Sequence, residues 1–118
     1  MEKLSYKISC LWGEYVFEAQ IAESFSYRTQ SDIEGFCDKE GTLADPKGFL
    51  ALLKEARIEN WEQEYDGDNS IEDAVLWNVE CVKGGCVWKI KGKEGFWPYG
   101  YEKLIEAIRL CDEDIDRF

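Results

Sequence analysis

Residues 3–21 alternate between apolar and polar side chains, and this period of two constrains the fold more than any other feature of the chain. A period of two is typical of a β-strand that buries one face. The alternation breaks once, at Trp12-Gly13, and then resumes. The first 22 residues therefore predict a β-hairpin, which Phe25 and Tyr27 extend or follow with a short third strand. The apolar positions of the hairpin are Leu4, Tyr6, Ile8, Cys10, Tyr15, Phe17, Ala19 and Ile21.

A second hairpin is predicted from 74–82 and 86–91, with Gly84-Gly85 as its two-residue corner because glycine tolerates the positive φ of such turns. The competing corner at Lys83-Gly84 would slide the pairing by two and place a lysine at positive φ. The favoured register pairs Lys83 with Cys86, Val82 with Val87, Cys81 with Trp88, Glu80 with Lys89, Val79 with Ile90 and Asn78 with Lys91.

Two helices are predicted. Asp45-Pro46 supplies an N-cap and a first-turn proline, and an apolar stripe then runs to about Arg57. The second helix is expected from Pro98 to about Cys111, with Leu104, Ile105 and Ile108 on its buried face. Residues 28–45 and the glycine-containing stretch 92–95 are interpreted as loops.

These elements predict one α+β domain over residues 1–118, in the order ββ(β)-α-ββ-α. We expect an antiparallel sheet of four to five strands with two helices against one face. If the sheet is strongly curved, it approaches a half-barrel.

The formal net charge of −11 would repel nucleic acid and anionic membranes, so neither is an expected partner. The charge fits a basic protein partner, and it equally fits a need for solubility alone. No stretch approaches the roughly 20 apolar residues of a membrane span, and the N-terminus does not resemble a signal peptide. Five cysteines, an odd number, indicate free thiols in a reducing compartment, so we expect a cytoplasmic protein.

The chain has no histidine, the commonest general base and transition-metal ligand. The pair Cys81-x4-Cys86 lacks a matching second pair for a zinc site. The turn 66–70 fails as an EF-hand because Ile71 and Trp77 stand where Gly and Glu are required. We therefore expect no metal, no cofactor and no enzymatic activity, with a carboxylate-dependent enzyme as a remote alternative.

Residues 59–73 contain seven carboxylates and no basic side chain, and they surround two aromatic residues four positions apart. On a helix those aromatics would share a face. This segment is the predicted surface for a basic partner, although the same pattern fits a helical end whose aromatics point inward. The candidate partner-binding residues are Glu59, Trp61, Glu62, Glu64, Tyr65, Asp66 and Asp68.

Four aromatic residues around a Pro-Gly frame form the other unusual segment, residues 96–101. They could form a binding platform beside a helix N-terminus, or they could anchor the last helix to the sheet. Trp12, at a tight turn, is a further candidate for exposure. The candidate platform residues are Phe96, Trp97, Tyr99 and Tyr101.

The second half resembles small uncharacterised bacterial domains that carry Trp-x3-Tyr after a helix, then Ile-x-Asp-Gly, a strand Trp, a Gly-containing loop and an aromatic-Pro before the last helix. The resemblance covers roughly residues 50–110 and implies a shared fold unit, with no catalytic or binding role attached. Ala74 departs from the pattern, where the family has Gly. The matching residues are Trp61, Tyr65, Ile71, Asp73, Trp77, Gly92, Trp97 and Pro98.

Three functional hypotheses follow. The first is a non-enzymatic acidic protein that binds a basic partner, by analogy with immunity-type inhibitors and anti-defence proteins of bacteria and phages; a polarised carboxylate face would favour it. The second is a small-molecule or peptide-binding domain that uses residues 96–101, which a concave aromatic pocket would favour. The third is an enzyme with a buried pair of carboxylates.

Overall fold

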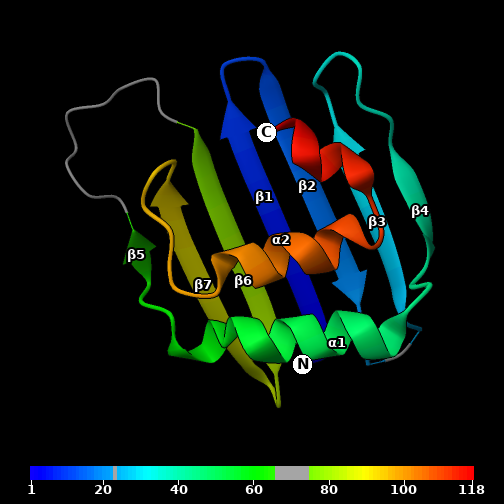
Figure 1. The fold of residues 1–118 in the computed structure, drawn as a ribbon, viewed down its shortest axis with the longest axis vertical. Helices are drawn as coiled ribbons and strands as arrows, with labels where there is room; N and C mark the ends of the chain where they lie inside the picture. The colour runs from blue at the N-terminus through cyan, green and yellow to red at the C-terminus, as the bar shows by residue number, and fades with distance from the viewer. Residues whose placement is uncertain (23, 66–74) are drawn as a thin grey trace.

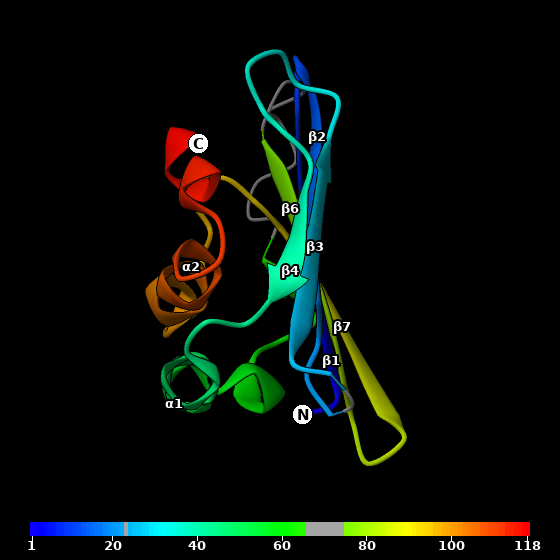
Figure 2. The ribbon, with the colours of Figure 1, turned by 90° about the vertical axis from the view of Figure 1, so that its right-hand side faces the viewer.

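The protein forms an open seven-stranded sheet with two α-helices packed on one of its faces, as seen in a computed structural model that describes residues 1–22, 24–65 and 75–118 (Figures 1 and 2). The strand order is β4-β3-β2-β1-β6-β7-β5, and all neighbours are antiparallel except β5 and β7, which are parallel. In the described residues, no helix is long and apolar enough to cross a membrane.

The elements are β1 (Lys3–Cys10), β2 (Gly13–Gln20), β3 (Ser26–Ser31), β4 (Lys39–Thr42), α1 (Pro46–Ala56), the 3₁₀ turn η1 (Ile58–Asn60), β5 (Glu64–Tyr65), β6 (Leu76–Lys83), β7 (Cys86–Lys93), α2 (Tyr101–Arg109) and the 3₁₀ turn η2 (Glu113–Arg117). The α+β class and the two helices agree with the sequence prediction. The prediction of four to five antiparallel strands was wrong, because the sheet has seven strands and is mixed.

Both predicted hairpins are confirmed. β1 and β2 pair from Lys3 opposite Gln20 to Cys10 opposite Gly13. The second hairpin turns at Gly84-Gly85, both with positive φ, and every pairing predicted from Lys83–Cys86 to Asn78–Lys91 is present. Cys81 consequently faces Trp88 rather than Cys86, and none of the five cysteines forms a disulfide.

The strands that the sequence analysis missed lie in its predicted loop 28–45 and in the acidic run. β3 extends to Ser31, and β4 pairs with it at the sheet edge. β4 reads Lys-Glu-Gly-Thr, which has no apolar alternation, because its inward side chain is a lysine that pairs with a carboxylate. β5 contributes only two residues, so no periodicity could reveal it.

The first helix begins as predicted, with Asp45 accepting a hydrogen bond from the Gly48 amide at 3.0 Å. The second helix begins at Tyr101, three residues later than predicted from Pro98. Gly100 adopts a φ of +96° and ends the preceding turn, so the helix can begin only after it. A side chain at Gly100 would also meet the Ala56 carbonyl oxygen at 2.5 Å, so this glycine lets the two helices approach.

The core lies between the sheet and the helices. The inward positions of β1, β2, β6 and β7 meet Phe49 and Leu53 of α1 and Leu104, Ala107 and Ile108 of α2, all buried. No helix formed by the described residues covers the opposite face of the sheet (Figure 2). A functional site could therefore lie either between the sheet and the helices or on the open face of the sheet.

Candidate functional site

A cleft of about 940 Å³ opens between the sheet and the second helix. Its floor comes from β1 and β6, its roof from α2, and its far wall from η2 and the C-terminal residue. Its lining is mostly apolar and aromatic, with few charged groups, which is the usual make-up of a ligand pocket. The lining residues are Tyr6, Ile8, Cys10, Trp12, Asp32, Ile33, Glu34, Phe36, Val75, Trp77, Glu94, Trp97, Tyr101, Ile105, Ile115, Arg117 and Phe118.

Tyr101, the first residue of α2, is the centre of an aromatic cluster in this cleft. Its ring lies 5.2 Å from that of Trp77 and 6.3 Å from that of Tyr6, centroid to centroid, so it fastens α2 to β6 and β1. Trp97 stacks on the Tyr101 ring, with centroids 5.8 Å apart and an interplanar angle of 22°. Trp97 itself is 50% exposed, so one face of this cluster is available to a ligand.

The hydroxyl groups of Tyr6 and Tyr101 hydrogen-bond to each other at 2.5 Å in the cleft wall. Burial, with the neighbouring Tyr101 adding to it, raises the pKa of Tyr6 far above the ordinary value. Burial also raises the pKa of Tyr101 to about 12, although the bond from Tyr6 opposes that shift. Both phenols are therefore protonated at neutral pH and act as hydrogen-bond donors rather than as phenolates.

The charged groups of the lining are three carboxylates and one guanidinium. Asp32, Glu34 and Glu94 are exposed, and Asp32 is held in place because its Oδ1 accepts a hydrogen bond from the Glu14 amide at 2.8 Å. Arg117 is already engaged, since it donates to the Gly35 carbonyl oxygen and lies over the Phe36 ring at 5.3 Å. The mouth of the cleft therefore favours a cation.

Exposed apolar side chains also surround the cleft. Trp12 lies at the β1–β2 turn with 77% of its surface exposed, as the sequence analysis anticipated, and Phe118 is 44% exposed. Both line the cleft. Large aromatic groups left in water beside an apolar hollow are typical of binding surfaces.

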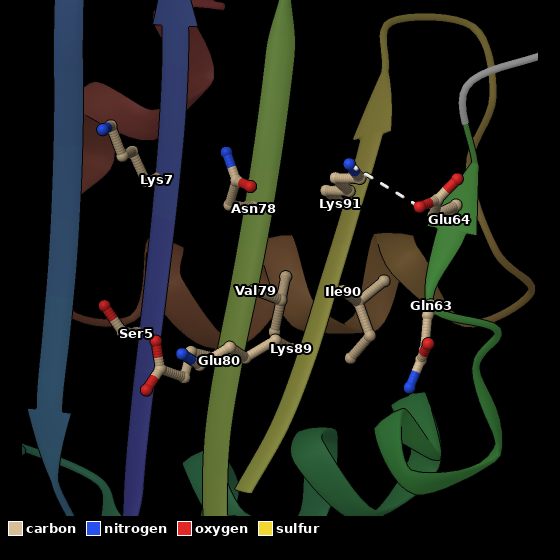
Figure 3. A pocket seen from close by; sticks show the side chains of 10 residues that line it. All are labelled: Ser5, Lys7, Gln63, Glu64, Asn78, Val79, Glu80, Lys89, Ile90 and Lys91. Atoms are coloured by element: carbon tan, nitrogen blue, oxygen red, sulfur yellow. Dashed lines mark ion pairs between the residues drawn. The ribbon is translucent and has the colours of Figure 1, made fainter.

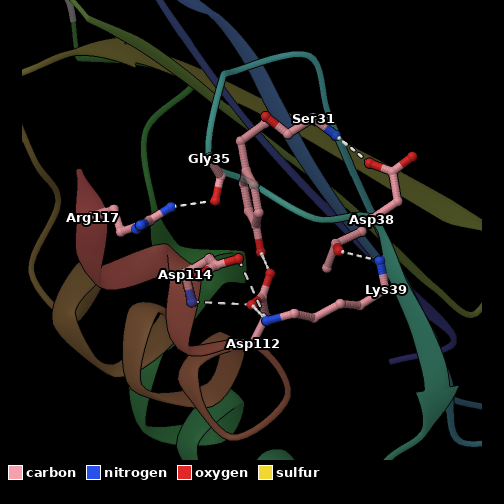
Figure 4. Close-up of polar contacts among 9 residues, drawn as sticks. Ser31, Gly35, Asp38, Lys39, Asp112, Asp114 and Arg117 are labelled. Atoms are coloured by element: carbon pink, nitrogen blue, oxygen red, sulfur yellow. Dashed lines mark hydrogen bonds and ion pairs between the residues drawn. The ribbon is translucent and has the colours of Figure 1, made fainter.

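A buried carboxylate fixes the far wall (Figure 4). Asp112 accepts hydrogen bonds from the Tyr15 hydroxyl at 2.8 Å, from Lys39 Nζ at 2.6 Å and from the Asp114 amide at 3.0 Å. Its side chain has no exposed surface. These contacts tie η2 to β2 and β4, and so hold Ile115 and Phe118 against the cleft.

The predicted platform residues separate into two pairs. Trp97 and Tyr101 line the cleft and also anchor the helix, so both readings of the segment apply to them. Phe96 and Tyr99 do not line it, and Tyr99 is 93% exposed. The four residues therefore do not form one continuous platform.

The predicted partner-binding segment is not an α-helix in its described part, because it passes from the 3₁₀ turn η1 through an irregular stretch into β5. Trp61 is buried, and its indole nitrogen donates to the carbonyl oxygens of Ala56 at 2.8 Å and Tyr99 at 3.1 Å. Tyr65 is half-buried and packs on Trp77, with ring centroids 5.9 Å apart. The two aromatics therefore point inward.

The acidic side chains of that segment are partly neutralised. Glu59 lies 3.4 Å from Lys83 Nζ, and Glu64 lies 3.6 Å from Lys91 Nζ. Glu62 is exposed. Asp66 and Asp68, together with the turn at 66–70, lie outside the described residues.

A second hollow, of about 410 Å³, lies on the open face of the sheet (Figure 3). Lysines and carboxylates of β1, β5, β6 and β7 line it together, and Lys91 pairs with Glu64 across it. Its charges are mixed and exposed, so they largely satisfy one another or the solvent. We therefore regard the cleft beneath α2 as the candidate site.

Groups for metal binding or acid–base chemistry are sparse where the structure describes the chain. Residues 1–22, 24–65 and 75–118 contain no group of three or more Cys, Asp or Glu side chains arranged to hold a metal ion. Among the same residues Asp112 is the one buried carboxylate, and Lys39 and Tyr15 occupy its oxygens.

Several lining residues were missed by the sequence analysis. Asp32, Glu34 and Phe36 fall in a stretch interpreted as a loop, and Arg117 and Phe118 follow the last predicted helix. Tyr6 and Ile8 were assigned to the core, which is correct, but the alternation could not show that their ends line a hollow. No local pattern joins these segments, because the cleft is assembled from parts of the chain up to 112 positions apart, Tyr6 and Phe118.

No family model and no curated protein matches this chain. The resemblance to small bacterial domains therefore stays a prediction.

Proposed function

We propose that this protein is a binding domain that takes a small ligand with an apolar, aromatic-sized body and a cationic group into the cleft between the sheet and α2. The observation that carries the proposal is the combination, in one cleft, of a stacked Trp97–Tyr101 pair with three carboxylates against one already engaged guanidinium. Aromatic faces attract organic cations through their ring quadrupole, and carboxylates attract them through opposite charge.

Size supports a small molecule or a short peptide side chain. A volume of about 940 Å³ falls within the range of about 300–1,000 Å³ that is usual for drug-sized ligands. The apolar body would displace water from Trp97, which is 50% exposed, and from the partly exposed Ile105, a gain of roughly 25 cal/mol per Å² of apolar surface covered.

The negative charge of the protein favours a cationic ligand, both within the cleft and at longer range. Close to the cleft, Asp32, Glu34 and Glu94 attract it directly. Further away, the net charge of −11 raises the local concentration of cations and speeds their approach at low salt.

The test compares two probes with the same two-ring body and oppositely charged end groups, para-benzylbenzylamine with an ammonium and para-benzylbenzoate with a carboxylate. Titration is followed in proton–nitrogen NMR spectra, in which the indole signals of Trp77 and Trp97 report on the cleft. We expect the amine to shift both signals and to bind at least about tenfold more tightly than the carboxylate, with the preference shrinking as salt rises.

A matched pair of variants locates the binding. Ile105→Trp places a large ring in the cleft, whereas Leu110→Trp adds the same ring to the exposed end of α2, outside the lining. We expect Ile105→Trp to abolish amine binding and Leu110→Trp to leave it unchanged. The proposal would be wrong if both probes bound equally tightly, or if neither variant lost amine binding.

A basic protein partner is a second proposal, supported by the number of acidic side chains in the β3–β4 loop and η2, of which Figure 4 shows Asp38 and Asp114. Asp32, Glu34 and Asp38 lie in that loop, and η2 adds Glu113, Asp114 and Asp116, against Lys39, Arg109 and Arg117. Such binding would lose affinity steeply with salt and would survive Ile105→Trp, which separates it from binding in the cleft. Absence of enzymatic activity stays a prediction.

A further inference from the structure

The hydroxyl pair of Tyr6 and Tyr101, two residues that line the cleft, has an unused hydrogen-bonding capacity. Each phenol carries one donor hydrogen and can also accept. The pair shares one hydrogen bond, and within the described residues neither hydroxyl has another partner. Whichever hydroxyl donates, the other keeps a free hydrogen.

The surroundings of the two hydroxyl groups indicate what a ligand of the cleft would offer them. Tyr6 is 1% exposed, and its neighbours in the cleft include Ile8, Trp77 and Ile105. Phenylalanine at both positions would fill the same ring volume without placing two polar groups in an apolar wall, which costs free energy unless they are satisfied. A hydrogen-bond donor in the lining of a mostly apolar hollow is the feature that usually orients a ligand.

We propose that the ligand of this cleft carries a neutral hydrogen-bond acceptor, such as a carbonyl or ether oxygen, that binds the free hydroxyl hydrogen of the Tyr6–Tyr101 pair. The inference rests on the proposed function, since it concerns the same cleft. It narrows the ligand class from an apolar cation to an apolar cation with an acceptor oxygen in its body.

The raised pKa values of Tyr6 and Tyr101 mean that the pair always offers a hydrogen-bond donor, and the carboxylates of the cleft favour a neutral acceptor. Burial holds the pKa of Tyr101 at about 12, so the pair keeps both hydrogens throughout the physiological range. A carboxylate acceptor would be repelled by Asp32, Glu34 and Glu94 at the mouth, whereas a carbonyl or ether oxygen carries no charge to repel.

The experiment uses two amines that differ in a single group, para-(aminomethyl)benzophenone, with a carbonyl between its rings, and para-benzylbenzylamine, with a methylene there. Affinities come from the same NMR titration of the full chain. On the wild-type protein we expect the ketone to bind about tenfold more tightly, the effect of one hydrogen bond.

Phenylalanine variants then test whether the preference for the ketone depends on the Tyr6–Tyr101 hydroxyl pair. Tyr6→Phe and Tyr101→Phe each leave one hydroxyl with a free hydrogen, so each should keep a preference for the ketone. The double variant has neither hydroxyl and should bind both amines equally. Tyr99→Phe, on an exposed tyrosine outside the lining, is the control and should keep the full preference.

The outcomes separate the two proposals. Equal binding of both amines to the wild-type protein, or an undiminished ketone preference in the double variant, overturns this inference and leaves the proposed function standing. If neither amine binds in the cleft, both proposals fail. The wild-type comparison needs no variant, so the inference is testable even if the double variant does not fold.

Discussion

Removing the Asp112 carboxylate should weaken the whole C-terminal wall of the cleft. Its oxygens accept hydrogen bonds from the Tyr15 hydroxyl, Lys39 Nζ and the Asp114 amide. Asp112→Ala would leave the Tyr15 hydroxyl without its acceptor, leave Lys39 with Asp114 alone at 3.5 Å, and remove the cap of η2. The wall that carries Ile115 and Phe118 depends on these contacts.

The magnitude follows from the burial of each partner. Tyr15 is 1% exposed, so its unpaired hydroxyl should cost about 1–3 kcal/mol. Loss of the cap adds about 1 kcal/mol. The Lys39 side chain is 36% exposed and can return to water, so its share is below about 1 kcal/mol. We therefore expect the free energy of unfolding to fall by about 3 kcal/mol.

The assay is urea unfolding followed by tryptophan fluorescence, because urea is uncharged and leaves ion pairs unscreened. Asp116→Ala is the matched control: it removes a carboxylate of η2 itself, but an exposed one that pairs with Arg109 at 2.8 Å, so the cost should stay below about 1 kcal/mol. Equal losses in the two variants, or a loss below about 1 kcal/mol in Asp112→Ala, would refute the reasoning.

The same carboxylate predicts a pH dependence. Burial alone would raise the pKa of Asp112, but hydrogen bonds from Lys39 and Tyr15 hold it below its ordinary value. Its contribution is therefore complete above the ordinary carboxyl pKa of about 4 and is lost as the pH falls through the lower folded-state value. The difference in the free energy of unfolding between the wild-type protein and Asp112→Asn should shrink as the pH falls below about 4. It should stay constant between about pH 5 and pH 8.

Three further predictions concern the core, the sheet and the thiols. Ile108→Ala should cost roughly 2–5 kcal/mol in urea unfolding because Ile108 is fully buried, and a loss below about 0.5 kcal/mol would place that helix face in solvent. Gly92→Ala should cost about 1–3 kcal/mol by the same assay, since the new methyl would lie 2.4 Å from the Trp77 indole; a neutral effect would contradict the packing. Thiol titration of the denatured, unreduced protein should find five groups per chain, whereas one or three would reveal disulfides.

Sequence reasoning predicted the elements that carry strong local signals. The alternation in residues 3–21 predicted the first hairpin, and the Gly84-Gly85 corner predicted the second one with its correct pairing, because register follows from which face is buried and from turn geometry. The Asp45-Pro46 start of α1 is equally local.

The elements that escaped prediction depend on partners distant in sequence. β4 points Lys39 inward, which no hydrophobic pattern reveals, because the compensating carboxylate is Asp112, at the other end of the chain. The later start of α2 depends on the approach of Gly100 to Ala56. The cleft was foreseen only through Trp97 and Tyr101, since its remaining walls come from loops and from the C-terminal turn.

Photolabelling with para-(aminomethyl)benzophenone tests the central claim most directly, because the excited ketone attaches covalently where it is bound. After irradiation, mass spectrometry of the digested protein locates the attachment. The account predicts labelling of peptides that line the cleft, above all those with Trp97 and Ile105, and suppression by excess para-benzylbenzylamine and in Ile105→Trp. Labelling spread over the open face of the sheet, or labelling that excess amine does not suppress, would contradict it.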